Sequence, residues 1–459
     1  MSATAPFPIT DGNFMMEKEP IVRIGLVLVE DAKTTIELVA PVAGFTADFG
    51  GATLELPAGK AVRAEVSGGA VRLVGPASGE GSVLRIIPPA SYRPSQPNDG
   101  LLLRGVIAGR GFHWQKLIDA SYTDVIELSV QGGKLIVVNE IPIETYLVGV
   151  ITGEMSGDCP VEFLKAQAVA ARAWLLGQPT APHPGQPFLW CNDDCCQRYQ
   201  GTGGWSPAAL EAIDQCRGQV LITREGHYCD ARYSKSTGGI SEDAESVWGH
   251  PISGLESMID APKASPAEKF FPVTDANIDE YLNGAWLEDT QCFASPNVVP
   301  ESTICRYLGR VDEAGEYFRW DLSFTHAELC ASLAKRGGIA DIGAILDLRT
   351  GTRGRSGRLE QLFVDYLSTT GEKKTATLAR EYNIRAGISM RFLFSSCFTL
   401  RLDHDANGHV ATAHLRGGGW GHGAGLCQIG ALGRAIKGQD CETILLAYYA
   451  GTTLERIYD

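Results

Sequence analysis

The stretch from residue 139 to residue 176 constrains the fold of this chain most, because two helical patterns flank a single acid there. Apolar residues recur at helical spacing from Ile143 to Ile151 and predict a short helix that ends near Thr152. Glu154 follows, between glycines that permit tight backbone turns. We therefore expect Glu154 to lie in a hinge that positions its carboxylate, whereas an ordinary solvated loop acid is the simpler alternative.

A second helix is predicted to open at Pro160, with Asp158 or Cys159 as its cap. Small apolar residues form a narrow stripe along this helix and would allow close packing. The expected hinge thus lies between the C-terminal end of one helix and the N-terminal end of the next. The two helix dipoles would shift the pKa of a carboxyl group there in opposite directions.

Composition limits the classes of protein that this chain can belong to. With 459 residues, of which 44% are hydrophobic, it can bury a large core and is long enough for two or three domains. A formal net charge of -14 and the lack of a basic run argue against binding nucleic acid through its phosphates. The first residues lack the basic start and apolar run of an export signal, and no segment approaches the roughly 20 apolar residues of a membrane span.

The part before the two helices reads as strands separated by Gly, Asn and Pro turns, and residues 125–138 predict a hairpin around Gly132 and Gly133. We expect an α+β fold with a β-rich N-terminal region at 1–103. A catalytic part at 104–263, an inserted auxiliary subdomain at 264–378 and a C-terminal completion of the catalytic groove at 379–459 would follow.

A second dense motif is GGGWGHGAGLCQIGA at residues 417–431. Glycines at this density let the backbone approach a ligand, and Trp420 beside His422 offers a ring face for a sugar. We interpret the motif as a binding lip, with Gln428 at the start of a helix. The alternative is a Gly-rich turn around a hydrogen-bonded histidine. A phosphate cradle is disfavoured, because neither a Lys-Ser/Thr pair nor a Rossmann strand accompanies the glycines.

Four motifs in order carry a resemblance to a known family. They are YLVGVITGEM with PVEFLKAQAVAARAW, then CCQRYQG, then ARYSKSTGGISEDAESVW, and finally GWGHGAGLCQIGALGRAIKG with ILLAYYAGT. Together they make the chain from about Arg104 to its end resemble the stage II sporulation protein D family, which includes the amidase enhancers.

The resemblance implies a lytic transglycosylase of the bacterial cell wall. Such an enzyme cleaves the β-1,4 bond between N-acetylmuramic acid and N-acetylglucosamine in glycan strands stripped of peptide, and leaves a 1,6-anhydro end. The family's single catalytic acid corresponds to Glu154. One carboxyl group suffices for this chemistry, because it protonates the leaving oxygen and then accepts the proton of the muramyl 6-hydroxyl. A hydrolase would need a second acid, for which the sequence offers Glu144, Asp158, Glu162 and Asp230.

By motif position the resemblance also implies a set of substrate-binding residues. For Arg172, a structural clamp is an equal alternative. The expected set is Lys165, Gln167, Arg172, Tyr199, Ser236, Thr237, Trp420, His422 and Gln428.

No cofactor is required by this chemistry, but a structural zinc is one interpretation of the crowded cysteines in WCNDDCCQRYQG. Some relatives hold zinc near the catalytic groove, and His183, Cys191, Cys195 and Cys196 offer the nitrogen and sulfur ligands that zinc prefers. Because Cys195 and Cys196 are adjacent, joint coordination is awkward. A disulfide centred on Cys191, or free thiols, therefore stay open as alternatives.

The expected partners are peptide-stripped glycan strands and a cell-wall amidase, and the expected location is the cell envelope, although no leader is visible. A non-catalytic murein-binding protein that stimulates an amidase is the main alternative. A zinc amidase built on His422 and the cysteines lacks an HExxH pair. A cysteine protease would pair Cys427 with His422, which are too close in the sequence for that arrangement.

Overall fold

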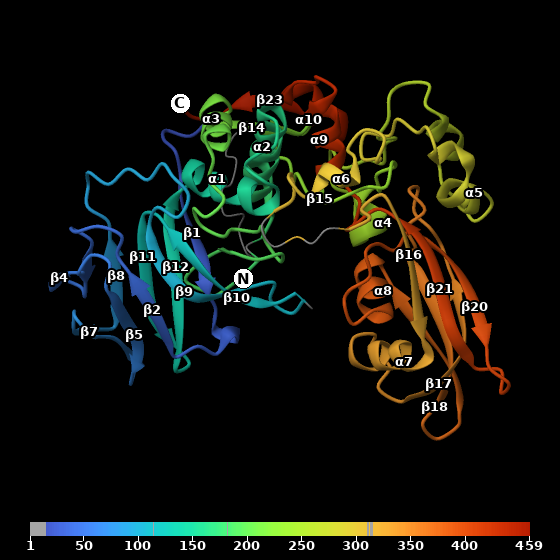
Figure 1. The fold of residues 1–459 in the computed structure, drawn as a ribbon, viewed down its shortest axis with the longest axis horizontal. Coiled ribbons are helices and arrows are strands. Elements are labelled where there is room, and N and C mark those ends of the chain that lie inside the picture. Colours follow the sequence, from blue (N-terminus) through green and yellow to red (C-terminus); the bar gives the residue numbers. More distant parts are fainter. Residues whose placement is uncertain (1–14, 113, 181, 310–311, 313–314) are drawn as a thin grey trace. The chain divides into compact units, whose positions relative to one another are not determined.

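The computed structural model describes residues 15–459 except 113, 181, 310–311 and 313–314. The chain forms two compact units (Figure 1). The first contains residues 1–220, 306–312 and 455–459, and the second contains residues 221–305 and 313–454. The chain leaves the first unit within β14 (Gln219–Ile222), returns to it briefly at residues 306–312, and returns for the last time within β23 (Thr453–Arg456). The mixture of helices and several sheets confirms the expected α+β class.

Two antiparallel-rich sheets make up most of the first unit. Their strand orders are β13-β1-β12-β11-β8-β3-β4 and β10-β9-β2-β5-β6-β7. The predicted hairpin is confirmed, because β11 and β12 pair around Gly132 and Gly133, which both have positive φ. The strands are β1 (Ile21–Val27), β2 (Thr35–Val39), β3 (Thr46–Asp48), β4 (Thr53–Glu55), β5 (Ala61–Ser67), β6 (Ala70–Val74), β7 (Gly79–Gly81), β8 (Val83–Ile87), β9 (Leu101–Ala108), β10 (Lys116–Tyr122), β11 (Val125–Gln131), β12 (Lys134–Pro142) and β13 (Trp190–Cys191), with a short 3-10 turn η1 (Val29–Asp31).

Three helices complete the first unit: α1 (Ile143–Glu154), α2 (Val161–Gly177) and α3 (Pro207–Gln215). Two expectations need correction. Helix α1 continues past Thr152, so Glu154 is its last residue instead of a hinge residue. Helix α2 has Pro160 at its N-cap position and no side-chain cap, so neither Asp158 nor Cys159 caps it. The fixed φ of Pro160, near -54°, suits the start of a helix, and the first N–H groups of α2 have no side-chain cap.

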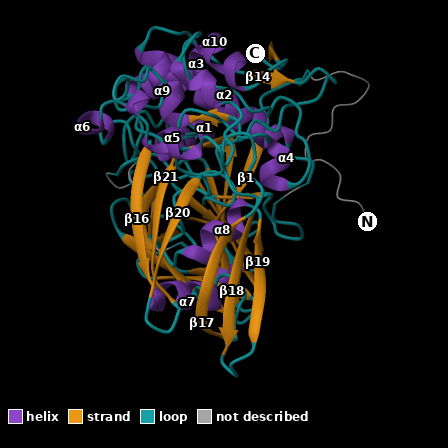
Figure 2. Cartoon of the chain, turned by 90° about the vertical axis from the view of Figure 1, so that its right-hand side faces the viewer, coloured by secondary structure: helices purple, strands orange, loops and turns teal. Residues whose placement is uncertain are grey.

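The second unit contains two three-stranded sheets, β16-β21-β20 and β17-β18-β19, with α7 and α8 packed on them (Figure 2). Their buried core includes Trp320, Leu329, Leu362 and Phe398. The elements are β15 (Tyr233–Ser234), α4 (Ala244–Trp248), η2 (Pro266–Phe270), α5 (Ile278–Asn283), η3 (Ala285–Leu287), α6 (Glu301–Ile304), β16 (Arg319–Thr325), α7 (His326–Lys335), β17 (Ile342–Thr350), β18 (Gln361–Ser368), β19 (Lys373–Ala379), α8 (Glu381–Ile388), β20 (Phe398–His404), β21 (Val410–Gly418), β22 (Leu426–Cys427), α9 (Gln428–Ile436) and α10 (Cys441–Tyr448).

Helix α9 begins at Gln428, as expected from the sequence. Among the described residues, none of the helices combines the length and the apolar character that crossing a membrane requires.

Candidate active site

Glu154 lies at the C-terminal end of α1 with only 8% of its surface exposed. Its Oε1 accepts a hydrogen bond of 3.0 Å from the backbone N–H of Arg198. The helix end touches the loop around Arg198 directly, because a Cβ on Gly153 would lie 2.7 Å from the Arg198 carbonyl oxygen. Backbone atoms therefore fix the position of the Glu154 carboxylate, as expected for a group that must meet its substrate in one orientation.

The side chain of Arg198 connects this carboxylate to two further acids. Its guanidinium forms ion pairs with Asp194 and Asp312 and lies 4.9 Å from the ring centre of Trp114. Burial raises the pKa of Asp194 to about 6, and the opposite effect of Arg198 only partly offsets this. Four charged side chains, three acidic and one basic, thus gather at the end of α1.

Asp312 comes from residues 306–312, which return to the first unit after 85 residues of the second. This segment, which we call the strap, runs along the residues that follow α1. The Ser156 N–H donates to the Tyr307 carbonyl at 2.9 Å, and Met155 and Leu308 form an isolated β-bridge. Asp312 Oδ2 accepts from the Gly309 N–H at 3.1 Å, which ties Asp312 to the part of the strap that contacts α1.

The expected polar face of α2 is mostly internal. Arg172 is fully buried, forms an ion pair with Glu144 and donates to the Gln219 carbonyl at 2.6 Å, so it is a structural clamp in the first unit. Gln167 is also fully buried. Lys165 is partly exposed and pairs with Glu162 at 2.8 Å.

Tyr199 is not on the surface either. It is 1% exposed, its hydroxyl donates to Asn139 Oδ1 at 2.7 Å, and its ring packs against Tyr122 and Tyr146. In this structure Tyr199 anchors the loop around Arg198 to the interior of the first unit instead of facing a ligand.

The four predicted metal ligands gather at one point in the first unit. One ligand atom from each of His183, Cys191, Cys195 and Cys196 lies within 4.8 Å of the others. The Cys191 and Cys195 sulfurs are 2.9 Å apart, and His183 Nε2 is 3.4 Å from Cys196 Sγ and 3.9 Å from Cys195 Sγ. Hydrogen bonds with the Cys191 and Cys196 thiols lower the pKa of Cys195. Adjacency therefore does not prevent Cys195 and Cys196 from reaching the same centre.

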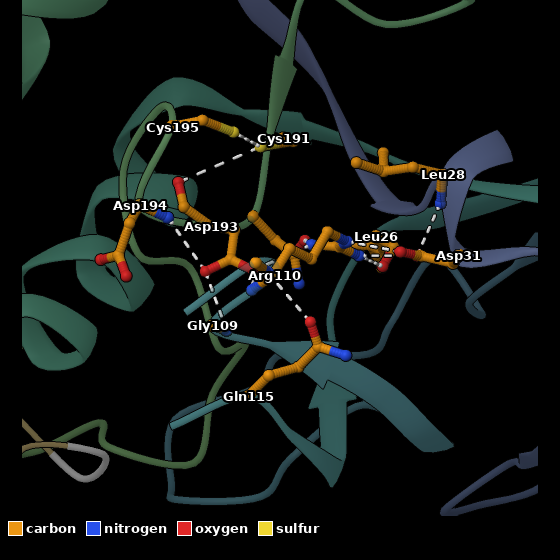
Figure 3. A network of polar contacts seen from close by, with 12 residues as sticks. Leu26, Leu28, Asp31, Gly109, Arg110, Gln115, Cys191, Asp193, Asp194 and Cys195 are labelled. Atoms are coloured by element: carbon orange, nitrogen blue, oxygen red, sulfur yellow. Dashed lines mark hydrogen bonds and ion pairs between the residues drawn. The ribbon is translucent and has the colours of Figure 1, made fainter. Parts of the chain in front are cut away.

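Arg110 anchors the loop that carries these cysteines (Figure 3). Its guanidinium pairs with Asp31 at 2.7 Å and with Asp193 at 3.2 Å, and it donates to Asn192 Oδ1 at 2.7 Å. Figure 3 shows Asp193 directed toward Gly109 and Arg110, whereas the carboxylate of Asp194 points away from them. The consecutive aspartates therefore serve opposite sides of the loop.

In the second unit, the STGG and Gly-rich motifs pair with each other. Ser236 and Trp420 exchange backbone hydrogen bonds of 3.0 and 2.7 Å, and the Thr237 N–H donates to Cys427 Sγ at 3.1 Å. Ser236, Thr237 and Gln428 are almost completely buried, at 0%, 2% and 1% exposure. The structure thus brings the predicted residues of these motifs together, but as internal contacts.

Trp420 is packed between two aromatic rings. It stacks on Phe394 with ring centres 3.9 Å apart, and Tyr317 lies 4.7 Å away at a tilt. The ring face expected to receive a sugar is therefore occupied on the Phe394 side.

His422 remains partly exposed and lies 5.0 Å from the ring of Trp248. Its Nδ1 accepts from the Ala424 N–H at 3.1 Å. Burial and the nearby Arg232 lower the pKa of His422 to about 3, so its imidazole is neutral at ordinary pH.

The glycines of the second motif make room for an internal guanidinium. A Cβ on Gly423 would lie 2.1 Å from Arg358 Cζ, and a Cβ on Gly419 would lie 2.8 Å from another atom of the same side chain. Arg358 is 2% exposed and donates to the carbonyl of Thr237 at 3.4 Å. The glycines were expected to let the backbone lie close to a ligand. Here they let it lie close to the Arg358 side chain.

Three charged residues beside Glu154 were not predicted. Arg198 lies within the CCQRYQG motif and Asp194 directly precedes it, so their charges in and beside the motif were a usable signal. Asp312 lies in a stretch without any motif, and only the tertiary structure brings it to this site.

Comparisons with known proteins agree with these motifs. A sequence model described as stage II sporulation protein matches residues 131–222, and a model of a domain of unknown function matches residues 272–425. An uncharacterized protein of Brachyspira hyodysenteriae is 26% identical over 359 residues, which cover 78% of this chain and 75% of that protein.

Two Bacillus proteins are similar over shorter parts. The amidase enhancer of Bacillus subtilis is 28% identical over 67% of this chain and 40% of its own length. Stage II sporulation protein D of Bacillus amyloliquefaciens is 27% identical over 31% of this chain and 45% of its own length. The chain thus spans less than half the length of either.

These similarities support a role related to the bacterial cell wall. Residues 131–222 match the stage II sporulation protein family, and the chain is similar to stage II sporulation protein D and the amidase enhancer.

Proposed function

We propose that the protein is a lytic transglycosylase that cleaves N-acetylmuramic acid–N-acetylglucosamine bonds in peptide-stripped glycan strands, with Glu154 as its general acid and base. The observation that carries the proposal is the fixed, nearly buried carboxylate at the end of α1, held by the Arg198 N–H. As an acid, Glu154 protonates the leaving O4. As a carboxylate, it accepts the proton of the muramyl 6-hydroxyl while O6 bonds to C1.

The surroundings of the other acids support a single-acid reaction. Glu144 accepts hydrogen bonds from Arg172, Tyr458 and the Gly218 N–H, so its lone pairs are occupied. Asp158 is largely exposed, with Arg306 at 3.8 Å.

The remaining candidates for a second acid are also paired. Glu162 pairs with Lys165, and Asp230 of the second unit pairs with Arg232 at 2.9 Å. Asp194 and Asp312 share Arg198. Each of these carboxylates is engaged by a cation, which disfavours its use as a base for water.

The test compares the wild-type protein with Glu154→Gln on peptide-stripped glycan strands, with products identified by mass spectrometry. We expect 1,6-anhydromuramyl ends from the wild type and a loss of about 10²–10⁴-fold in rate for Glu154→Gln, because an amide cannot donate this proton. Glu162→Gln, the same change on the exposed start of α2, serves as the control and keeps the wild-type rate. Equal turnover by Glu154→Gln contradicts the proposal.

A second candidate function is stimulation of a cell-wall amidase without glycan cleavage. It is favoured by the similarity to a protein named amidase enhancer over 67% of this chain. In that case neither the wild type nor Glu154→Gln releases anhydromuramyl products, and both raise the rate of a cell-wall amidase on intact murein equally.

We further propose that His183, Cys191, Cys195 and Cys196 hold a structural zinc ion. Three sulfurs and one imidazole nitrogen are a common ligand set for structural zinc, and zinc–sulfur bonds of about 2.3 Å place tetrahedral sulfur ligands about 3.8 Å apart. The Cys191 and Cys195 sulfurs, 2.9 Å apart, would separate to admit the ion, and all four ligand atoms already lie within 4.8 Å of one another. A bound ion would tie the His183 loop to the loop that ends at Arg198, without taking part in the reaction.

A further inference from the structure

Arg198 occupies a special place among the charges at the end of α1. Its backbone N–H holds the Glu154 carboxylate, while its side chain holds two other carboxylates, Asp194 and Asp312. Only 15% of the Arg198 side chain is exposed, and only 8% of the Asp312 side chain. The ion pairs are therefore shielded from solvent, where charge interactions are stronger than at a surface.

A second acid next to the glycosidic bond would affect which product the reaction gives. After C1–O4 cleavage, C1 can bond to the muramyl O6 or to the oxygen of water. Attack by water needs a carboxylate that accepts one proton from the water molecule. Asp194 and Asp312 are carboxylates of the kind that would serve, but both accept hydrogen bonds from the Arg198 guanidinium instead.

We propose that Arg198 is a positioning and specificity-determining residue that directs the reaction toward internal attack by O6. It orients Glu154 through its backbone and keeps Asp194 and Asp312 paired so that neither activates water. This inference rests on the proposed transglycosylase function.

The strap supports Glu154 and Arg198 in this arrangement. The strap belongs to the first unit. Its contacts with Ser156 and Met155 fix the residues that follow Glu154. Asp312 then adds the second arm of the Arg198 clamp. The region between the ARYSKSTGGISEDAESVW motif and the GWGHGAGLCQIGALGRAIKG motif would thus contribute Asp312 to the support of Glu154.

The experiment digests peptide-stripped glycan strands in water enriched in ¹⁸O, using the full-length protein. A product end formed by water carries ¹⁸O at C1 and is one water heavier than an anhydro end, so mass spectrometry measures the two fractions separately. We expect almost only anhydro ends from the wild type. For Arg198→Gln we expect at least a tenfold rise in the ¹⁸O-labelled fraction together with slower total cleavage.

Further variants separate the proposal from a loss of folding, which thermal melting monitors. Arg198→Lys keeps the charge but not the fork of donors, and we expect an intermediate labelled fraction. Asp312→Asn should slow cleavage about three- to tenfold without raising the labelled fraction, and the combination of Arg198→Gln with Asp312→Asn should lower the fraction found for Arg198→Gln. Arg306→Gln, an exposed arginine of the same strap, is the matched control.

An unchanged product ratio in both folded Arg198 variants overturns the inference. If Arg198→Gln does not fold, the Lys variant and Asp312→Asn decide, and wild-type behaviour of both overturns it. If the wild type releases no anhydro ends, the proposed function fails, and this inference fails with it.

Discussion

Arg172 on α2 and Glu144 on α1 form a buried ion pair in which Nε lies 3.1 Å from Oε1. Neither side chain is more than 5% exposed. Burial acts to raise the pKa of Glu144, but Arg172, Tyr458 and the Gly218 N–H together outweigh burial, so the pKa is lowered overall. The pair fixes the two helices that flank the candidate acid.

Replacing Arg172 by Met leaves the Glu144 charge buried without its cation. We expect a loss of about 3–5 kcal/mol in the free energy of unfolding, measured by urea denaturation. Lys165→Met removes the partly exposed pair with Glu162 and should cost no more than about 0.5 kcal/mol. Similar losses for both variants would show that Arg172 is not a clamp.

Glu242 in the second unit should make stability depend on pH. Burial raises its pKa from 4.5 to about 7, although Ser356 donates to its carboxylate at 2.6 Å. Between these two values the folded protein binds the proton more tightly than the unfolded chain. Stability therefore falls as pH rises from about 5 to 8, by roughly 3 kcal/mol.

The variant Glu242→Gln tests this dependence, because an amide does not titrate. Urea denaturation at pH 5 and pH 8 should show that wild type loses stability relative to Glu242→Gln on going to pH 8. Parallel curves for the two proteins would contradict the raised pKa. Glu162→Gln should follow the wild-type curve.

The space around Gly423 predicts a sharp cost for a single methyl group. Gly423 has a φ of +77°, and a Cβ there would collide with Arg358. We expect Gly423→Ala to destabilise the protein by about 3 kcal/mol, from backbone strain and overpacking together. Gly408→Ala has a φ of +79° but open space around it, so about 1 kcal/mol is expected. Thermal and urea denaturation that give equal losses would exclude the packing contribution.

Zinc at the cysteine cluster predicts a measurable metal content. The protein purified without chelator should contain about one zinc per chain, and a strong chelator should lower its melting temperature. Cys195→Ser and Cys196→Ser should lose the metal, whereas Cys305→Ser, an exposed cysteine outside the cluster, should keep it. A metal-free protein with two fewer titratable thiols would instead indicate a disulfide.

Local patterns predicted much of the fold. The hairpin around Gly132 and Gly133 was predictable because two glycines between alternating strands favour one tight turn. Strand β5, in contrast, carries Arg63 and Glu65 and lacks a continuous apolar run, so its sequence indicates a strand only weakly. The end of α1 was placed two residues early, because glycine near a helix end resembles a stop signal.

The motifs located the candidate acid but not the groups around it. Glu154 and the four metal-ligand candidates follow from residue types in short segments. The motifs suggested Tyr199 and Arg172 as substrate-binding residues, yet both are buried. A sequence pattern does not state which side of an element faces solvent.

By itself, the sequence determined the α+β class and the clustered cysteines, and it predicted the family resemblance and the candidate acid, because each depends on residues near one another in the chain. Only the tertiary structure decided that Asp312 meets Arg198 across 114 residues and that Arg358 fills the space left by the glycines. The physical reason is that such contacts depend on how the chain returns to itself, and burial and ion pairing arise only once distant segments pack together.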